Sequence, residues 1–242
     1  MTRSAPCMKP VAIFRHSPTE GPGYFATYLA RHRIDWRIIA IDGGEPVPSD
    51  PTAYSGLVFM GGPMSVNDDL PWIAPALQLI RDAVAADVPV LGHCLGGQLM
   101  SKALSGTVSR NPVKEIGWGN VDVARNDEAT AWFCHAAPQF TSFHWHGETF
   151  SIPPGATRVL ANANCANQAF AIGKHLGMQC HIEMTPEMIE SWCVSGAAEI
   201  AASASPAVQS VDSIKAQASR HLPALHAVAD GVYDRWIRGL KS

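Results

Sequence analysis

The sequence contains no run of lysine and arginine and few charged residues of either sign. Charged side chains make up 16% of the 242 residues, and the formal net charge at pH 7 is -3. Proteins that grip nucleic-acid phosphates need clustered basic residues, so this composition argues against a nucleic-acid partner. No apolar stretch reaches the length that a membrane-spanning helix requires, so we expect no membrane partner either.

Three further signals are missing. The first ten residues lack the apolar segment of a secretory signal. No Gly-rich loop of the Walker type is present to hold ATP phosphates. The cysteines form no Cys-x-x-Cys pair of the kind that many zinc sites use. We therefore expect a cytoplasmic protein with reduced thiols, no metal and no cofactor; its six cysteines are Cys7, Cys94, Cys134, Cys165, Cys180 and Cys193.

The first half of the chain alternates short apolar runs with helical patterns. The apolar runs predict buried strands at residues 11–16, 36–41, 56–60 and 88–93. The helical patterns cover residues 24–33, 73–86 and 96–105. Because each strand is continuously apolar and is followed by a helix, we expect a mostly parallel α/β sheet with helices on both faces.

The second half reads differently. Short strand-like runs are separated by Gly, Pro and Asn, which predicts a small antiparallel β insertion. These runs cover residues 121–123, 140–145, 157–161, 169–173 and 177–181. A helix is expected at 186–195, followed by a helical tail over about 208–240. We therefore predict one domain at residues 1–195 and a C-terminal helical extension at 196–242 that packs on it.

The sharpest local pattern surrounds Cys94. An apolar strand leads directly into this cysteine, a helix follows it, and Gly92 and Gly96 stand two residues before and after it. This is the cysteine version of a Gly-x-Ser-x-Gly nucleophile elbow, in which bulky flanking side chains would collide. A thiol at a helix N-terminus is favoured as the reactive thiolate. The alternative is a buried core cysteine in a glycine-rich turn.

A candidate base and its orienting acid lie downstream. His181 and Glu183 are two residues apart in an expected strand, so their side chains can point the same way. His181 can accept the thiol proton and return it to a leaving amine, while Glu183 holds the imidazole in position. A lone His-x-Glu pair is weak evidence, and it gains weight from following the elbow.

These motifs together resemble the class I glutamine amidotransferases, and most closely the stand-alone proteins similar to the amidotransferase domain of GMP synthase. Residues 92–98 (GHCLGGQ) match the family pattern G-x-C-x-G-x-Q. Residues 179–183 (QCHIE) match Q-F-H-P-E, with Cys180 in place of the aromatic residue and Ile182 in place of proline. Residues 60–66 (MGGPMSV) resemble the oxyanion loop, and residues 145–148 (WHGE) resemble the segment around the glutamine head, where Asp is commoner than Glu148.

The resemblance implies a flavodoxin-like fold, a mechanism and a set of site residues. Cys94 would attack a γ-glutamyl amide with help from His181 and Glu183, and the N–H groups of Gly62 and Leu95 would hold the oxyanion. Glutamine or another γ-glutamyl compound would be the small-molecule substrate. The substrate-binding residues would be Gln98, Trp145, His146, Gly147 and Glu148.

The residues leave three functions open. The first is an amidotransferase subunit that releases ammonia for a partner synthetase or another acceptor, because about 50 residues after the last motif leave no room for a synthetase module. The second is a stand-alone γ-glutamyl peptidase or hydrolase, in which water is the final acceptor. The third is a non-catalytic regulatory protein with the same fold. The residues 94, 181 and 183 do not separate the first two, because both form the same acyl-enzyme.

Overall fold

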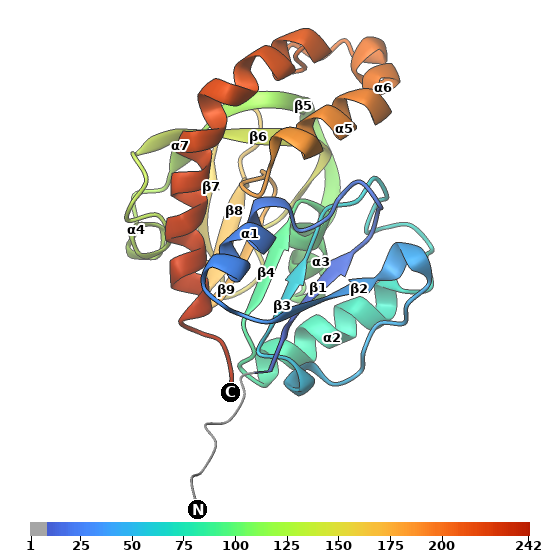
Figure 1. Ribbon diagram of the computed structural model, residues 1–242, viewed down its shortest axis with the longest axis vertical. Helices are drawn as coiled ribbons and strands as arrows, with labels where there is room; N and C mark the ends of the chain where they lie inside the picture. Colours follow the sequence, from blue (N-terminus) through green and yellow to red (C-terminus); the bar gives the residue numbers. More distant parts are fainter. Residues whose placement is uncertain (1–8) are drawn as a thin grey trace, which may run out of the picture.

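One nine-stranded sheet runs through the computed structural model, which describes residues 9–242 and therefore leaves Cys7 outside the described residues. The strand order is β2-β1-β3-β4-β9-β8-β7-β5-β6, and its first five strands are parallel (Figure 1). That parallel order, 2-1-3-4-5 along the chain, is the flavodoxin-like arrangement. The predicted fold class is confirmed. The parallel strands are β1 (Val11–Arg15), β2 (Trp36–Ala40), β3 (Gly56–Phe59), β4 (Val90–His93) and β9 (His175–Met178).

The antiparallel strands continue the same sheet and are longer than their sequence signals. The short runs predicted at 121–123 and 140–145 are the ends of two long strands that pair with each other. Polar side chains and Pro112 hide most of the first of these strands, and its pairing register shifts between Arg110 and Glu115. The four strands are β5 (Val108–Val123), β6 (Gln139–Phe150), β7 (Thr157–Ala161) and β8 (Ala169–Ile172).

Helices cover both faces of the sheet, as the continuously apolar strands require. Along β1, Val11 and Ile13 face one apolar cluster, while Ala12 and Phe14 face the other. The first cluster includes residues from α1 (Gly23–Arg31), α5 (Pro186–Ser195) and α7 (Val211–Ile237). The second lies under α2 (Ile73–Ala85) and α3 (Leu95–Ala103). Both faces of every central strand are therefore buried.

The C-terminal tail is one helix of 27 residues, α7, which continues through Pro223. It runs beside α1 and α4 (Asp127–Trp132) in Figure 1, and it also contacts α5. Tyr233 and Trp236 on α7 are fully buried in the cluster that includes α1. The tail thus packs on the main core, whereas the domain boundary at residue 195 stays a prediction. Shorter elements are α6 (Ala197–Ala202) and the 3-10 helices η1 (Ile41–Gly43) and η2 (Pro51–Ala53).

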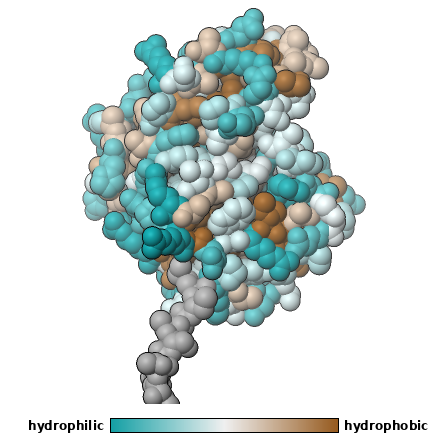
Figure 2. All heavy atoms as spheres, in the orientation of Figure 1, coloured by the Kyte–Doolittle hydropathy of each residue, from teal (hydrophilic) through white to brown (hydrophobic). Residues whose placement is uncertain are grey.

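The outer surface carries mixed side chains. On the face drawn in Figure 2, the hydrophobic residues form separate groups among hydrophilic ones. Across residues 9–242, no helix combines the length and the apolar character needed to cross a membrane.

Candidate active site

Cys94 stands at a strained turn between β4 and α3. Its φ is 51° and its ψ is -107°, a conformation that L-residues rarely adopt, and its N–H donates to the Met178 carbonyl at 2.8 Å. A Cβ on Gly92 would lie 2.5 Å from the backbone of Gly96, and a Cβ on Gly96 would overlap the Phe59 carbonyl. The turn therefore requires glycine on both sides of the cysteine, as the elbow motif predicts.

His181 and Glu183 meet in the interior, although not on a regular strand. β9 ends at Met178, so the predicted strand at 177–181 is wrong at its C-terminal end, where the chain leaves its pairing with β4. An isolated bridge to Phe143 holds His181 instead. Its Nδ1 lies 2.6 Å from Oε1 of Glu183. Nε2 of His181 has no hydrogen-bond partner among the described residues, and the His181 side chain lines the same cavity as Cys94.

The surroundings give these two groups opposite charges. Burial on its own lowers the pKa of His181, but the Glu183 carboxylate and then the Cys94 thiol outweigh it and hold this pKa well above its usual value. Burial on its own raises the pKa of Glu183, but His93 and His181 together lower it to about 2. Nε2 of His93 lies 3.7 Å from Oε2 of Glu183, behind the pair. The arrangement favours an imidazolium held by a carboxylate.

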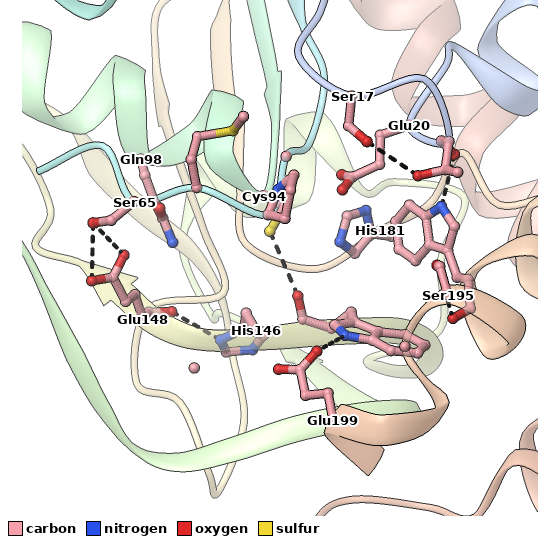
Figure 3. Close-up of a pocket in the computed structure, with 18 of the residues that line it drawn as sticks. Ser17, Glu20, Ser65, Cys94, Gln98, His146, Glu148, His181, Ser195 and Glu199 are labelled. Carbon is pink, nitrogen blue, oxygen red and sulfur yellow. Dashed lines mark hydrogen bonds between the residues drawn. The ribbon is translucent and has the colours of Figure 1, made fainter. Parts of the chain in front are cut away.

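A cavity of about 490 Å³ opens over these residues (Figure 3). That volume is within the range of about 300–1,000 Å³ usual for small-molecule sites. Gly62 lines the cavity, and Leu95 begins α3 directly after Cys94. Neither of their backbone N–H groups has an acceptor among the described residues. Both N–H groups are therefore available to a bound ligand.

The residues predicted to bind substrate all line this cavity. Gln98, Trp145, His146, Gly147 and Glu148 surround it together with Cys94. The Glu148 carboxylate accepts a hydrogen bond from the Ser65 hydroxyl at 2.9 Å. The Trp145 carbonyl lies 3.8 Å from Sγ of Cys94, and the Trp145 indole N–H donates to Glu199 at 2.9 Å. Strand β6 thus supplies one wall of the cavity.

Two cavity neighbours were missed by sequence reasoning. Nε2 of Gln179 donates to Sγ of Cys94 at 3.4 Å, and its Oε1 accepts from Gln98 at 3.1 Å. Glu20 lines the cavity near His181, from the loop that follows β1. Gln179 lay inside the matched motif and could have been singled out there. Glu20 had no such signal, because the loop that carries it shows no motif.

A second buried group supports the β6 wall. Oε2 of Glu115 lies 3.0 Å from Nε2 of His146, whose Nδ1 donates to the Glu148 carbonyl at 2.9 Å. Burial opposes ionisation of Glu115, but the hydrogen bond from His146 lowers its pKa to about 2. Among the described residues, Glu115, His144 and His146 have ligand-type atoms within 4.8 Å of one another and could face a metal. The sequence had indicated no such histidine cluster, because Glu115 comes from another strand.

Comparison with known proteins agrees with this fold and site. Residues 26–192 match the family model described as glutamine amidotransferase class-I. Because this match covers more than half of the chain, the protein belongs to the class-I glutamine amidotransferase family. The family resemblance drawn from residues 92–98 and 179–183 is confirmed.

Individual relatives differ in how much of their length is matched. The glutamine amidotransferase-like protein YfeJ of Salmonella typhimurium is 31% identical over 166 residues, which is 66% of this chain and 68% of that protein. The GMP synthase of Lacticaseibacillus casei is 31% identical over 135 residues, which is 54% of this chain and 25% of the synthase. The chain thus spans about a quarter of the length of that synthase.

Solved structures extend the similarity to nearly the whole chain. A glutamine amidotransferase from Methylobacillus flagellatus is 44% identical with a TM-score of 0.94, over 97% of this chain and 96% of that one. A glutamine amidotransferase from Thermotoga maritima is 26% identical with a TM-score of 0.86, over 96% of this chain and 99% of that one. The C-terminal helix falls within this coverage.

Proposed function

We propose that this protein hydrolyses a γ-glutamyl amide through a thioester on Cys94. One observation carries the proposal: a cysteine in a strained elbow shares a cavity with a histidine whose Nδ1 is bonded to a buried carboxylate at 2.6 Å. A nucleophile, a base and a group that orients the base are the three parts that acyl transfer needs.

The reaction divides into two balanced steps. In the first, the Cys94 sulfur bonds to the amide carbon, the C–N bond breaks, and His181 gives its proton to the departing amine. In the second, water gives a proton to His181 and its oxygen bonds to the carbonyl carbon, so that the C–S bond breaks and glutamate leaves. The N–H groups of Gly62 and Leu95 stabilise the oxyanion in both steps, and each such donor contributes about 3–4 kcal/mol in other enzymes.

The substrate's amino-acid end is assigned to the β6 side of the cavity. Glu148 provides a carboxylate for the α-amino group, and its position next to Ser65 supports this role. Gln98 and the Gly147 backbone provide polar contacts for the α-carboxylate. Trp145 and His146 form the wall between these groups and Cys94. The substrate amide then reaches the sulfur between Glu148 and His181 (Figure 3).

The acceptor of the released amine separates two versions of this function. One of the subunits of the GMP synthase of Sulfurisphaera tokodaii is 31% identical over 134 residues, 54% of this chain and 68% of that protein. This similarity supports an ammonia-supplying subunit that works with a separate synthetase. The alternative is hydrolysis with water as the only acceptor. A non-catalytic role is disfavoured, because a strained cysteine elbow costs stability that a binding protein does not need.

Release of glutamate and amine tests the proposal. The purified protein and its Cys94→Ala variant are incubated with glutamine and with several γ-glutamyl amides. We expect turnover that depends on Cys94. Slow hydrolysis of glutamine alone supports the subunit that needs a partner, and faster hydrolysis of a larger amide supports the stand-alone hydrolase. Equal turnover by both proteins would contradict the proposed nucleophile.

A further inference from the structure

Glu20 places a carboxyl group in the cavity without a protein partner for its charge. Its carboxylate makes no hydrogen bond or ion pair with the described residues, and the residue is only partly exposed. A Cβ added to Gly61 would overlap Oε2 of Glu20 and stand 3.5 Å from Cε1 of His181. The Glu20 carboxyl group and the His181 ring therefore lie against the same backbone point.

The loop that carries Glu20 is fixed rather than loosely placed. The Glu20 N–H donates to the Ser17 carbonyl at 3.0 Å, which closes a turn. The Trp192 indole N–H donates to the Thr19 carbonyl at 2.8 Å and ties this turn to α5. Because both ends of the turn are held, the carboxyl group of Glu20 is preorganised next to His181.

Glu20 and Glu148 lie at opposite ends of the reacting centre. Figure 3 shows Glu148 and Ser65 on one side of Cys94, and Glu20 and His181 on the other. In the proposed function His181 gives its proton to the departing amine, and Glu148 binds the α-amino group. Whatever is attached beyond the departing nitrogen therefore meets Glu20. This step rests on the proposed function.

We propose that Glu20 makes the enzyme selective for γ-glutamyl amides whose leaving amine carries a second, positively charged amino group. An ammonium ion next to a partly buried carboxylate forms a charge-assisted hydrogen bond, which is stronger than a neutral one. A neutral leaving group leaves the carboxylate without a partner, and a leaving group with its own carboxylate is repelled. Glutamine, which releases ammonia, fills none of this end of the cavity.

The state of Glu20 fits an empty cation site. Burial raises the pKa of Glu20 to about 7, and nearby Glu183 raises it further while His181 opposes them. These two are the charged groups that face Glu20. A bound ammonium would favour the ionised carboxylate. The selectivity for a cationic substrate should therefore grow as pH rises from about 6 to about 8, while the ammonium keeps its proton.

Three γ-glutamyl amides of similar size test the proposal. The leaving groups are 2-aminoethylamine, propylamine and glycine, which add a cation, a methyl group or a carboxylate beyond the same nitrogen. We measure kcat/KM for each with the wild type, with Glu20→Gln and with Glu199→Gln. Glu199 is the matched control, because it lines the same cavity but already pairs with Lys114 at 2.5 Å.

The ratio of kcat/KM for the cationic and neutral amides is the readout, because general damage to the site cancels in it. We expect a ratio of about ten or more at pH 8 in the wild type and in Glu199→Gln, and a ratio near one in Glu20→Gln. A wild-type ratio near one, or a ratio that Glu20→Gln does not change, overturns the inference and leaves the proposed function intact. Absence of Cys94-dependent turnover of every γ-glutamyl compound overturns both.

Discussion

Nδ1 of His181 lies 2.6 Å from Oε1 of Glu183, and both residues are 1% exposed. Water cannot screen this contact, so the charge on each group depends strongly on the other. The same contact leaves Nε2 of His181 without a protein partner on the side of the Cys94 cavity. The pair therefore links the stability of the folded chain to the chemistry that we propose for it.

Replacing Glu183 with glutamine should impair hydrolysis far more than it impairs substrate binding. The amide keeps the size of the carboxylate but no longer stabilises the imidazolium, and it can hold the wrong tautomer of His181. We expect kcat to fall on the order of 10³- to 10⁴-fold. Steady-state kinetics on a γ-glutamyl amide measure this loss. Glu187→Gln is the control, because that carboxylate is exposed on the first turn of α5; an equal loss in both variants would contradict the assigned role.

The same substitution should change how stability depends on pH. The pKa of Glu183 is lowered to about 2 from 4.5, so its contribution to stability is present above about pH 4.5 and is lost as pH falls toward 2. The raised pKa of His181 acts in the other direction, with a contribution present below pH 6.5 and lost at higher pH. Urea unfolding should therefore show the largest difference between wild type and Glu183→Gln near pH 5–6. A difference that grows on acidification to pH 3 would contradict this account.

The elbow predicts a sharp contrast between two glycines. A Cβ on Gly96 would overlap the Phe59 carbonyl, whereas a Cβ on Gly21 would meet no atom within 4 Å. Gly96→Ala should lower the free energy of unfolding by about 1–3 kcal/mol or more, because the backbone must move. Gly21→Ala should change it by less than about 0.5 kcal/mol. Denaturant unfolding of both variants measures this, and equal effects would show that the elbow is not tightly packed.

The C-terminal helix predicts a contrast between two tryptophans. Trp236 on α7 is fully buried, whereas Trp36 on the edge strand β2 is 37% exposed. Trp236→Ala should lower the free energy of unfolding by about 3–5 kcal/mol. Trp36→Ala should lower it by clearly less, since more of that side chain already contacts water. If the two losses are alike, α7 is not part of the main core.

The parallel half of the fold was readable from the sequence because its strands are buried on both faces. Predicted and observed strand ends there differ by one or two residues, as for β1, predicted at 11–16 and observed at Val11–Arg15. The long antiparallel strands were not readable. β5 alternates buried and exposed side chains irregularly and includes Pro112 and Gly117, the latter with a φ of 110°. α4 was also missed, because its six residues are too few for a periodic pattern.

The candidate site was predictable where its residues sit in motifs. Cys94, His181 and Glu183 carry local spacing that reflects their chemistry, and the structure brings them to one place. Glu20 and the Glu115–His146 pair were not predictable. Their meaning comes from neighbours on other strands and loops, and contacts between distant segments leave no periodic signal in a single sequence.

The central claim is that Cys94 carries the γ-glutamyl group during turnover. The direct measurement is an acid quench of the protein during turnover of a γ-glutamyl amide, followed by mass spectrometry of its peptides. We predict a mass increase of one γ-glutamyl group on the peptide that contains Cys94, absent from the Cys94→Ala variant and absent from the peptide that contains the exposed Cys134. Full turnover by Cys94→Ala, or an adduct on another residue in place of Cys94, would contradict the account.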